Sequence, residues 1–295
     1  MLSRKNIESA LAAYAGHKDP AVRAQLRALG PALLAAADAR ASLAAEVPDW
    51  SDEEIAAAAT GKAKLLSVRP VAIDAKRFAE VLGRIAAAMI EGNEAAGAEA
   101  KLIPGMKAFD FAPYITEPML ALAGRDPLAY LEKADGMAGQ GALTDLFVFP
   151  ALGLALRTFL DAAADEASRR IEPLLKNDTH LSRPLRCPVC GSEAEIAAVE
   201  PTAANGNVKR LYCECCGAGW LFERIRCAHC GNEAVSDFDY VHDEDDLTHR
   251  LHRDRRCGAS VPTVFPKSAE GFCPEVESIV MAGLFVFSEG QKDAA

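Results

Sequence analysis

Apolar residues in the first part of the chain recur three and four positions apart. In residues 76–91 (KRFAEVLGRIAAAMIE), this spacing places four large side chains on one helical face: Phe78, Leu82, Ile85 and Met89. Alanine is abundant up to about residue 180, and prolines divide the region into segments. At the usual helix length of about 11–12 residues, the pattern predicts an all-α domain over residues 1–180, a bundle of about six to eight helices.

The pattern changes near residue 180. Residues 176–186 (KNDTHLSRPLR) are polar and end close to a proline, so we interpret them as a linker. Beyond them, β-branched and aromatic residues and tight-turn signals become more frequent, until the segment 274–287 (PEVESIVMAGLFVF) predicts a final helix. The expected fold class is α+β: the helical domain is followed by a small β-rich domain over residues 181–295 with a C-terminal helix.

Four short stretches of the second half share one pattern. They are CPVCG at 187–191, CECCG at 213–217, CAHCG at 227–231, and DRRCG at 254–258, where Asp254 replaces the first cysteine. Two thiolates on such a turn, here called a knuckle, can chelate one metal ion. The glycine permits a positive φ without a Cβ clash, and backbone N–H groups of the turn can point at the sulfurs.

Each pair of knuckles encloses a predicted hairpin. Between the first two, an apolar run at 196–199 (IAAV) and an Asn205-Gly206 turn signal predict strand, turn and strand. Between the last two, the polar turn 243–246 (DEDD) follows strand-forming residues, namely Val235, Phe238, Tyr240 and Val241. The knuckle–hairpin–knuckle unit therefore repeats with an offset of about 40 residues, as from Cys187 to Cys227.

The repeat predicts two tandem four-ligand sites in a rubredoxin-like or zinc-ribbon domain. The first comprises Cys187, Cys190, Cys213 and Cys216, and the second comprises Cys227, Cys230, Asp254 and Cys257. Four thiolates in a tetrahedron suit zinc or a single iron. In the second site a carboxylate oxygen of Asp254 can bind zinc, and a nearby histidine could replace it: His252, His249 or His242.

The sequence leaves the pairing of the knuckles open. Only ten residues separate Cys216 from Cys227, so crossed pairing is an alternative. The segment 220–226 (WLFERIR) in this gap is a candidate for a strand shared by both sites. Of the other two cysteines, Cys215 is expected to be a packed or exposed bystander and Cys273 a core thiol, with ligation at the second site as the alternative for Cys273.

The distribution of cysteines and the net charge limit the classes of function that fit the chain. The nine cysteines all lie between Cys187 and Cys273, which favours a metal site over a disulfide framework. The net charge is −10, and residues 187–260 hold eight Lys/Arg against thirteen Asp/Glu. Because nucleic-acid binding needs a basic surface, this charge argues against a nucleic-acid-binding zinc ribbon.

The N-terminal stretch and the most apolar run of the chain bear on where in the cell the protein is expected. The N-terminal stretch MLSRKNIESALAAYAGHKDP lacks the apolar core of a signal peptide. The most apolar run, 146–156 (LFVFPALGLAL), is shorter than the roughly 20 residues that cross a bilayer. We therefore expect a cytoplasmic protein without membrane insertion.

The order of motifs resembles one family. RCPVCG is followed by LYCxxC, by Trp220 four residues after Cys216, by RxxCxxCG and by a final CG. From Arg186 to Gly231 this order and spacing resemble the FdhE family of formate dehydrogenase accessory proteins. The helical half fits the family only in architecture. The departure is Asp254, where the family pattern has cysteine.

The resemblance implies a cytoplasmic assembly factor that is not an enzyme. Members bind the catalytic subunit of a respiratory formate dehydrogenase, which carries a molybdenum or tungsten pterin cofactor, and are required for its maturation or activity. Their knuckles resemble rubredoxin sites and are thought to hold iron. The alternative from another class is a rubredoxin-like electron-transfer module, which zinc in place of iron would exclude. No catalytic motif such as G-x-S-x-G or H-E-x-x-H occurs in the sequence.

Overall fold

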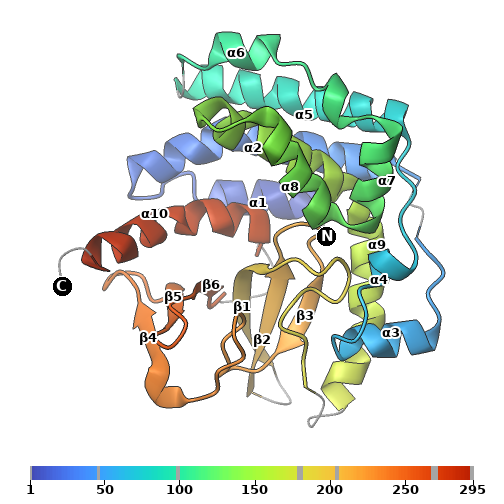
Figure 1. The fold of residues 1–295 in the computed structure, drawn as a ribbon. Coiled ribbons are helices and arrows are strands. Elements are labelled where there is room, and N and C mark those ends of the chain that lie inside the picture. The colour runs from blue at the N-terminus through green and yellow to red at the C-terminus, as the bar shows by residue number, and fades with distance from the viewer. Residues whose placement is uncertain are drawn as a thin grey trace.

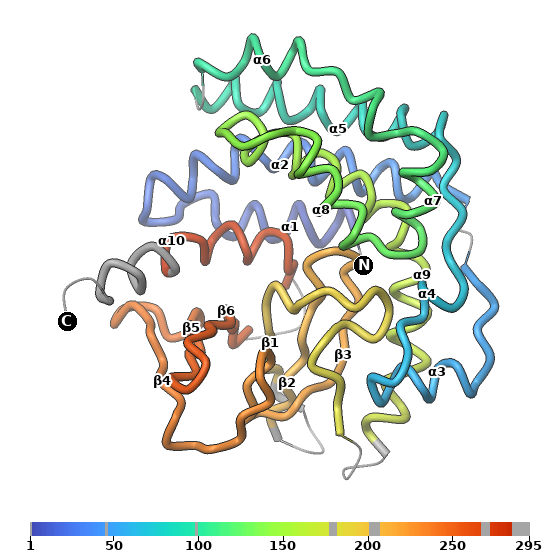
Figure 2. The backbone as a smooth tube through the Cα atoms, in the orientation of Figure 1, coloured from blue at the N-terminus to red at the C-terminus, as the bar shows by residue number. Residues whose placement is uncertain are grey.

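The computed structural model describes residues 2–44, 47–97, 100–177, 182–202, 206–266 and 272–292. Helices are stacked on one side of a six-stranded sheet (Figure 1). The trace in Figure 2 runs from the helices into the sheet and returns in a last helix, which lies between the two. The expected combination of a helical N-terminal part with a cysteine-rich β part is confirmed.

Ten α-helices lie within the described residues. Their bounds are α1 Arg4–Ala13, α2 Pro20–Ser42, α3 Asp52–Ala59, α4 Leu65–Val68, α5 Ala75–Ala96, α6 Ile103–Ala108, α7 Glu117–Arg125, α8 Pro127–Ala138, α9 Phe149–Asn177 and α10 Pro274–Lys292. The first nine precede the sheet and the tenth is the predicted final helix. The predicted boundary between the two domains, between residues 180 and 181, lies outside the described residues.

The apolar face predicted for residues 76–91 forms the core side of α5. Phe78, Leu82, Ile85 and Met89 are each at most 1% exposed, and α5 packs against α2 and α9. Asp74 caps this helix by accepting a hydrogen bond from the backbone N–H of Arg77, and Gly97 ends it in the left-handed conformation. The capping residues and the apolar spacing indicate the same helix, so nearby residues in the sequence are enough to determine it.

The long apolar segment before the linker forms the central helix of the molecule. A π-helical turn, Thr144–Val148, leads into α9. Thr144–Lys176 is long and apolar enough to cross a membrane, but 67% of its most apolar window is buried inside the protein. The helix contacts α2, α3, α5, α8 and strand β3, as a core helix does.

The sheet joins both cysteine repeats. Its strands are β1 Ala194–Thr202, β2 Gly206–Cys213, β3 Gly219–Phe222, β4 Phe238–Val241, β5 His249–Asp254 and β6 Ser260–Val264, in the order β3-β2-β1-β6-β5-β4. Both predicted hairpins are present as the antiparallel pairs β1–β2 and β4–β5. Asn205, in the predicted turn, lies outside the described residues.

Two details of the predicted strands are wrong. Val235 lies in a 3-10 turn, Val235–Asp237, and is 67% exposed, because β4 begins only at Phe238. The segment 220–226 is not a strand shared by both repeats: β3 pairs with β2 alone, at one edge of the sheet. The repeats are joined instead by a parallel pairing of β1 with β6, through Ala197↔Thr263 and Ala198↔Val264.

The helices and the first repeat share one hydrophobic core. It includes Leu156 and Leu160 of α9 together with Val189, Leu211 and Trp220 of the first repeat. The indole N–H of Trp220 donates to the carbonyl of Pro184, just before the first knuckle. A smaller cluster, made by Ile196, Leu251, Val264 and Met281, lies where α10 covers the second repeat.

Candidate metal centres

The four knuckles have nearly the same backbone. In the first, the N–H of Gly191 donates to the carbonyl of Cys187, and the N–H of Cys187 donates to the carbonyl of Ser192. The DRRCG knuckle repeats both bonds, from Gly258 N–H to Asp254 and from Asp254 N–H to Ala259. All four closing glycines have positive φ, between +71° and +87°. Asp254 therefore occupies the position of a first knuckle cysteine without disturbing the turn.

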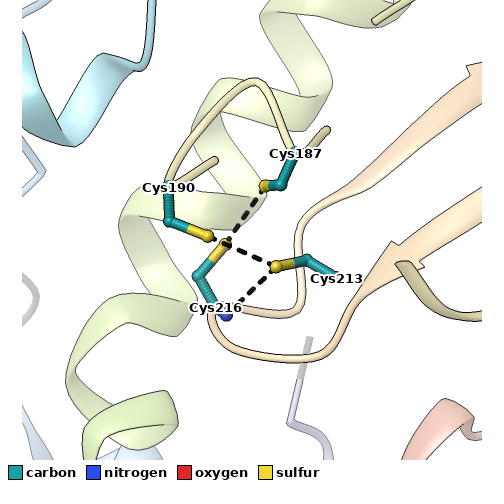
Figure 3. A group of neighbouring side chains, drawn as sticks. All are labelled: Cys187, Cys190, Cys213 and Cys216. Atoms are coloured by element: carbon teal, nitrogen blue, oxygen red, sulfur yellow. Dashed lines mark hydrogen bonds between the residues drawn. The ribbon is translucent and has the colours of Figure 1, made fainter. Parts of the chain in front are cut away.

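Site 1, formed by Cys187, Cys190, Cys213 and Cys216, is fully buried. Its sulfurs point toward one another from two knuckles (Figure 3). The Sγ atoms of Cys187 and Cys216 are 3.6 Å apart, and those of Cys190 and Cys213 are 3.3 Å apart. The backbone N–H groups of Cys215 and Cys216 lie 3.4 and 3.5 Å from the Cys213 sulfur. The predicted N–H···S contacts are therefore present.

The helical part holds site 1 in place. The first two N–H groups of α4, at Leu65 and Leu66, donate to the carbonyls of Pro188 and Val189 inside the first knuckle. A helix N-terminus leaves such groups without partners in its own helix. The knuckle supplies the acceptors, so its position depends on α4.

A buried arginine lies against the second knuckle of site 1. A Cβ atom at Gly217 would lie 1.6 Å from the guanidinium carbon of Arg157 in α9, so a side chain there would displace the arginine. Arg157 Nη2 is 2.6 Å from Glu275 Oε1 in α10, and its Nε is 3.8 Å from Asp161 Oδ1. Burial lowers the pKa of Arg157, but Glu275, Asp161 and Cys216 raise it overall, so the cation persists beside the thiols.

The thiols of site 1 resist collective ionisation. Burial raises the pKa of Cys187 and of Cys216. Burial also raises the pKa of Cys190, but hydrogen bonds with the neighbouring thiols lower it below its usual value. Four thiolates this close repel one another in a buried site, so their joint ionisation needs a bound cation.

Site 2, formed by Cys227, Cys230, Asp254 and Cys257, lies between the last two knuckles. Cys227 and Asp254 are buried, whereas Cys230 and Cys257 are exposed. The sulfurs of Cys227 and Cys257 are 3.7 Å apart. Asp254 Oδ2 lies 3.1 Å from the sulfur of Cys230 and 3.5 Å from that of Cys257. The knuckles therefore pair without crossing.

The two carboxylate oxygens of Asp254 have different partners. Oδ2 faces the thiols, and Oδ1 accepts hydrogen bonds from the amide of Asn232 at 3.2 Å and the backbone N–H of Arg256 at 2.8 Å. Cys213 in site 1 receives the corresponding N–H, from Cys215. Burial raises the pKa of Asp254, but the hydrogen bonds from Cys230, Arg256 and Asn232 lower it well below its ordinary value. The aspartate is held as an anion, with one oxygen directed into the site.

The donor distances fit a small divalent ion. Zinc–sulfur bonds of about 2.3 Å and zinc–oxygen bonds of about 2.1 Å place tetrahedral ligands about 3.6–3.8 Å apart. The contacts between donor atoms, from 3.1 to 3.7 Å over the two groups, equal these separations or are a few tenths of an ångström shorter. Each group can hold a metal ion, and four sulfur donors also suit iron. The identity of the metal and the assignment of these eight residues as its ligands stay predictions.

The three histidines considered for site 2 lie elsewhere. His242 is exposed and its Nδ1 contacts the Asp243 carbonyl. The ring of His252 packs edge-on against Tyr240. His249 is buried between Asp246 and Glu277. Asp254 is therefore the residue that the structure brings to the three cysteines.

The remaining cysteines are buried outside both groups. Cys215 contributes its N–H to the sulfur of Cys213, while its own thiol is 3% exposed. Cys273 precedes α10 and its thiol donates to Glu275 at 3.2 Å. Burial raises the pKa of Cys273 above its usual value. Both lie outside the two groups as expected, and Cys215 is the packed of its two alternatives.

His249 links three elements next to the second repeat. Its Nδ1 is 2.6 Å from Asp246 Oδ2, and its Nε2 is 2.9 Å from Glu277 Oε2 in α10. The hydroxyl of Tyr14 in α1 donates to Glu277 at 2.8 Å. Burial lowers the pKa of His249, but Glu277 and Asp246 raise it overall. The imidazole thus joins the hairpin to α10 through two carboxylates, and Tyr14 adds α1.

The sequence did not reveal two residues that complete these surroundings. Arg157 lies 30 residues before Cys187, in a helix whose pattern gave no sign that it reaches the knuckles. Asn232 directly follows the CAHCG knuckle, and its amide also contacts Asp237 at 3.1 Å. The sequence did carry one sign of Asn232: a polar residue directly follows the knuckle glycine there, as Ser192 does after the first knuckle, where its hydroxyl contacts the Cys190 thiol.

Comparison with known proteins gives a consistent picture. No protein-family model matches the chain. A stretch of 105 residues, 36% of this chain, is 24% identical to a protein called FdhE homolog from Aquifex aeolicus (strain VF5) and spans 37% of that relative's length. The fold is similar to the crystal structure of the FdhE protein from Pseudomonas aeruginosa, with a TM-score of 0.56 over 98% of this chain and 91% of that chain, at 15% identity. The resemblance to FdhE proteins noted from the motifs is confirmed.

Proposed function

We propose that this chain is an accessory protein that binds the catalytic subunit of a respiratory formate dehydrogenase and is required for its maturation or activity. In this role it is not an enzyme, and it acts in the cytoplasm before the dehydrogenase is complete. Sites 1 and 2 each hold one iron or zinc ion. The metals stabilise the surface that meets the subunit.

The observation that carries the proposal is the pair of knuckle groups joined by one sheet, in a chain whose fold is similar to the FdhE crystal structure over 98% of its length. Small hairpins bury too little apolar surface to fold alone, and a bound metal supplies the missing stability. The knuckle contacts to α4 and Arg157 support a scaffold in which metal binding orders the sheet against the helices.

The alternative, a rubredoxin-like electron-transfer module, depends on the metal. An iron bound by four thiolates changes oxidation state, whereas zinc does not. Site 1 has the donors for such an iron, but all four are buried. A site buried in the core has little contact with solvent or a partner, which favours a structural role for its metal.

The test is deletion of the gene in a host that makes a respiratory formate dehydrogenase. We expect formate dehydrogenase activity to fall to background while the catalytic subunit is still synthesised, and plasmid-borne wild-type chain to restore it. A tagged chain should also retain the catalytic subunit on an affinity column. Full activity in the deletion strain would overturn the proposal.

A further inference from the structure

The two edges of the six-stranded sheet differ. At one edge, β3 is covered by α9, and the N–H of Gly219 donates to Ser168 of that helix at 3.1 Å. At the other edge is β4, and no described strand pairs with its outer side. Figure 1 shows β4 at the border of the molecule. An edge of this kind presents unpaired N–H and C=O groups to any strand that approaches.

The register identifies the free backbone groups. The N–H of Arg255 donates to the carbonyl of Asp237, so hydrogen bonding to β5 continues at Asp239 and Val241. The alternate residues, Phe238 and Tyr240, direct their N–H and C=O groups outward. Native edges are commonly protected by lysine or proline, and β4 (FDYV) has neither.

The internal repeat indicates what such an edge accepts. β4 follows the third knuckle as β1 follows the first, so the two strands are equivalent. The outer edge of β1 is occupied by β6, which pairs with it through Ala197↔Thr263 and Ala198↔Val264. The equivalent edge of β4 has no partner among the described strands. By analogy with β1, the outer edge of β4 is therefore suited to pairing with a further strand.

Apolar side chains surround β4 and acidic ones fill the loop after it, while Arg253 and Arg255 beside the strand pair with its own Asp239. Tyr240 within the strand is 51% exposed, and Val235 and Leu247 on either side of it along the chain are 67% and 64% exposed. A cleft of about 890 Å³ adjoins it, between the loop after β4, the turn between α1 and α2, and α10. The loop carries four consecutive acidic residues, 243–246, of which the first three are exposed. Among the described residues that line the cleft, the basic side chains are histidines and Lys18, and Lys18 pairs with Asp243.

We propose that the outer edge of β4 is a docking site for an extended, basic polypeptide segment. The segment adds a strand to β4, its apolar side chains cover Tyr240 and Leu247, and its lysine or arginine side chains enter the acidic cleft. Strand addition of this kind gains affinity from main-chain hydrogen bonds and selectivity from side chains. The inference goes beyond the proposed function, because it concerns the chemistry of the segment whichever protein carries it.

Charge decides between a partner and a second copy of the chain. Pairing of two β4 edges would bring together two acidic loops in a protein whose net charge is already −10. Like charges in juxtaposition oppose such a contact. A basic segment instead meets charges of the opposite sign, so a foreign segment is the occupant that fits.

The experiment measures binding of fluorescent seven-residue peptides by anisotropy at low salt. The first peptide alternates lysine and valine, the second alternates glutamate and valine, and the third is the lysine peptide with N-methyl groups on alternate amides. We expect the lysine peptide to bind about tenfold or more tightly than either of the others. Equal affinity for the N-methylated peptide would overturn strand addition, and equal affinity for the glutamate peptide would overturn the charge assignment.

A matched pair of double variants places the site. Glu244→Gln with Asp245→Asn should weaken binding of the lysine peptide about fivefold to tenfold. Glu132→Gln with Asp135→Asn changes the net charge equally on exposed positions of α8 and should leave the affinity within about twofold. Equal loss in both would mean a general charge effect and would overturn the site. A salt-resistant dimer of the unliganded chain in sedimentation would assign the edge to a second copy instead.

Discussion

Sites 1 and 2 share the same turn geometry, but site 1 lies within the core that helices and sheet have in common, whereas site 2 lies in the second repeat with two of its four side chains exposed. Site 1 has four sulfurs and is held by α4 and Arg157. Site 2 has three sulfurs and a carboxylate, and its surroundings are Asn232 and the backbone of its own knuckles. Sequence repetition has produced two similar turns in unequal environments.

The difference separates two roles for similar motifs. A buried site whose loss leaves unpaired thiols in the core is coupled to the stability of the whole chain. An exposed site at one end of a sheet is coupled to its own hairpin and to whatever docks there. We infer that site 1 supports the fold, and that site 2 is the more exchangeable site, close to the surface available to partners.

The largest expected effect separates the two sites by stability. Cys213→Ser removes a buried donor of site 1 and should lower the free energy of unfolding by on the order of 4 kcal/mol or more. Cys257→Ser removes an exposed donor of site 2 and should cost about 1–2 kcal/mol. Urea unfolding followed by far-UV circular dichroism, on protein loaded with zinc, measures both.

Cys215→Ser serves as the control for this pair, because Cys215 is a buried cysteine of the same knuckle that lies outside site 1. It should retain the metal and lose less stability than Cys213→Ser. Equal destabilisation by Cys213→Ser and Cys257→Ser would remove the distinction between the two sites.

A smaller effect concerns the attachment of the second repeat through His249. The pKa of His249 is raised in the folded chain, so its stabilising charge is complete below the unfolded value of about 6.5 and is lost as pH rises through the folded value. His249→Gln should therefore lower the free energy of unfolding by about 1–3 kcal/mol at pH 6. The difference from wild type should shrink toward pH 9.

His242→Gln is the matched control, because His242 is an exposed histidine near the same loop. Urea midpoints measured from pH 5.5 to 9 should be nearly those of the wild type for this variant. A His249→Gln deficit that stays constant over the same range would show that the ring acts through packing and that its charge contributes nothing.

Much of this architecture follows from local sequence. The spacing of Phe78, Leu82, Ile85 and Met89 predicted the buried face of α5, and the knuckle spacing predicted both four-residue groups, including Asp254. These features depend on residues close together along the chain. The role of the knuckle glycines is equally local, since each takes the positive φ that its own turn requires.

The missed features depend on contacts between distant segments. No local pattern distinguishes a strand at the sheet edge from a shared strand, so the sequence leaves residues 220–226 as a candidate for a shared strand although β3 lies at the edge. The parallel pairing of β1 with β6 joins residues more than 60 positions apart. Arg157 approaches Gly217 for the same reason, because the packing of α9 on the first repeat brings them together. Such contacts are set by the tertiary arrangement.

The measurement that tests the account most directly is staged removal of metal from zinc-loaded protein. The wild type should hold two zinc ions per chain, and a chromophoric chelator should take one at least about tenfold faster than the other. Asp254→Cys should slow the fast phase, and Cys257→Ser should abolish it while the slow phase remains. One slow phase in the wild type, or two phases that both disappear in Cys257→Ser, would contradict the assignment of a stable site 1 and an exchangeable site 2.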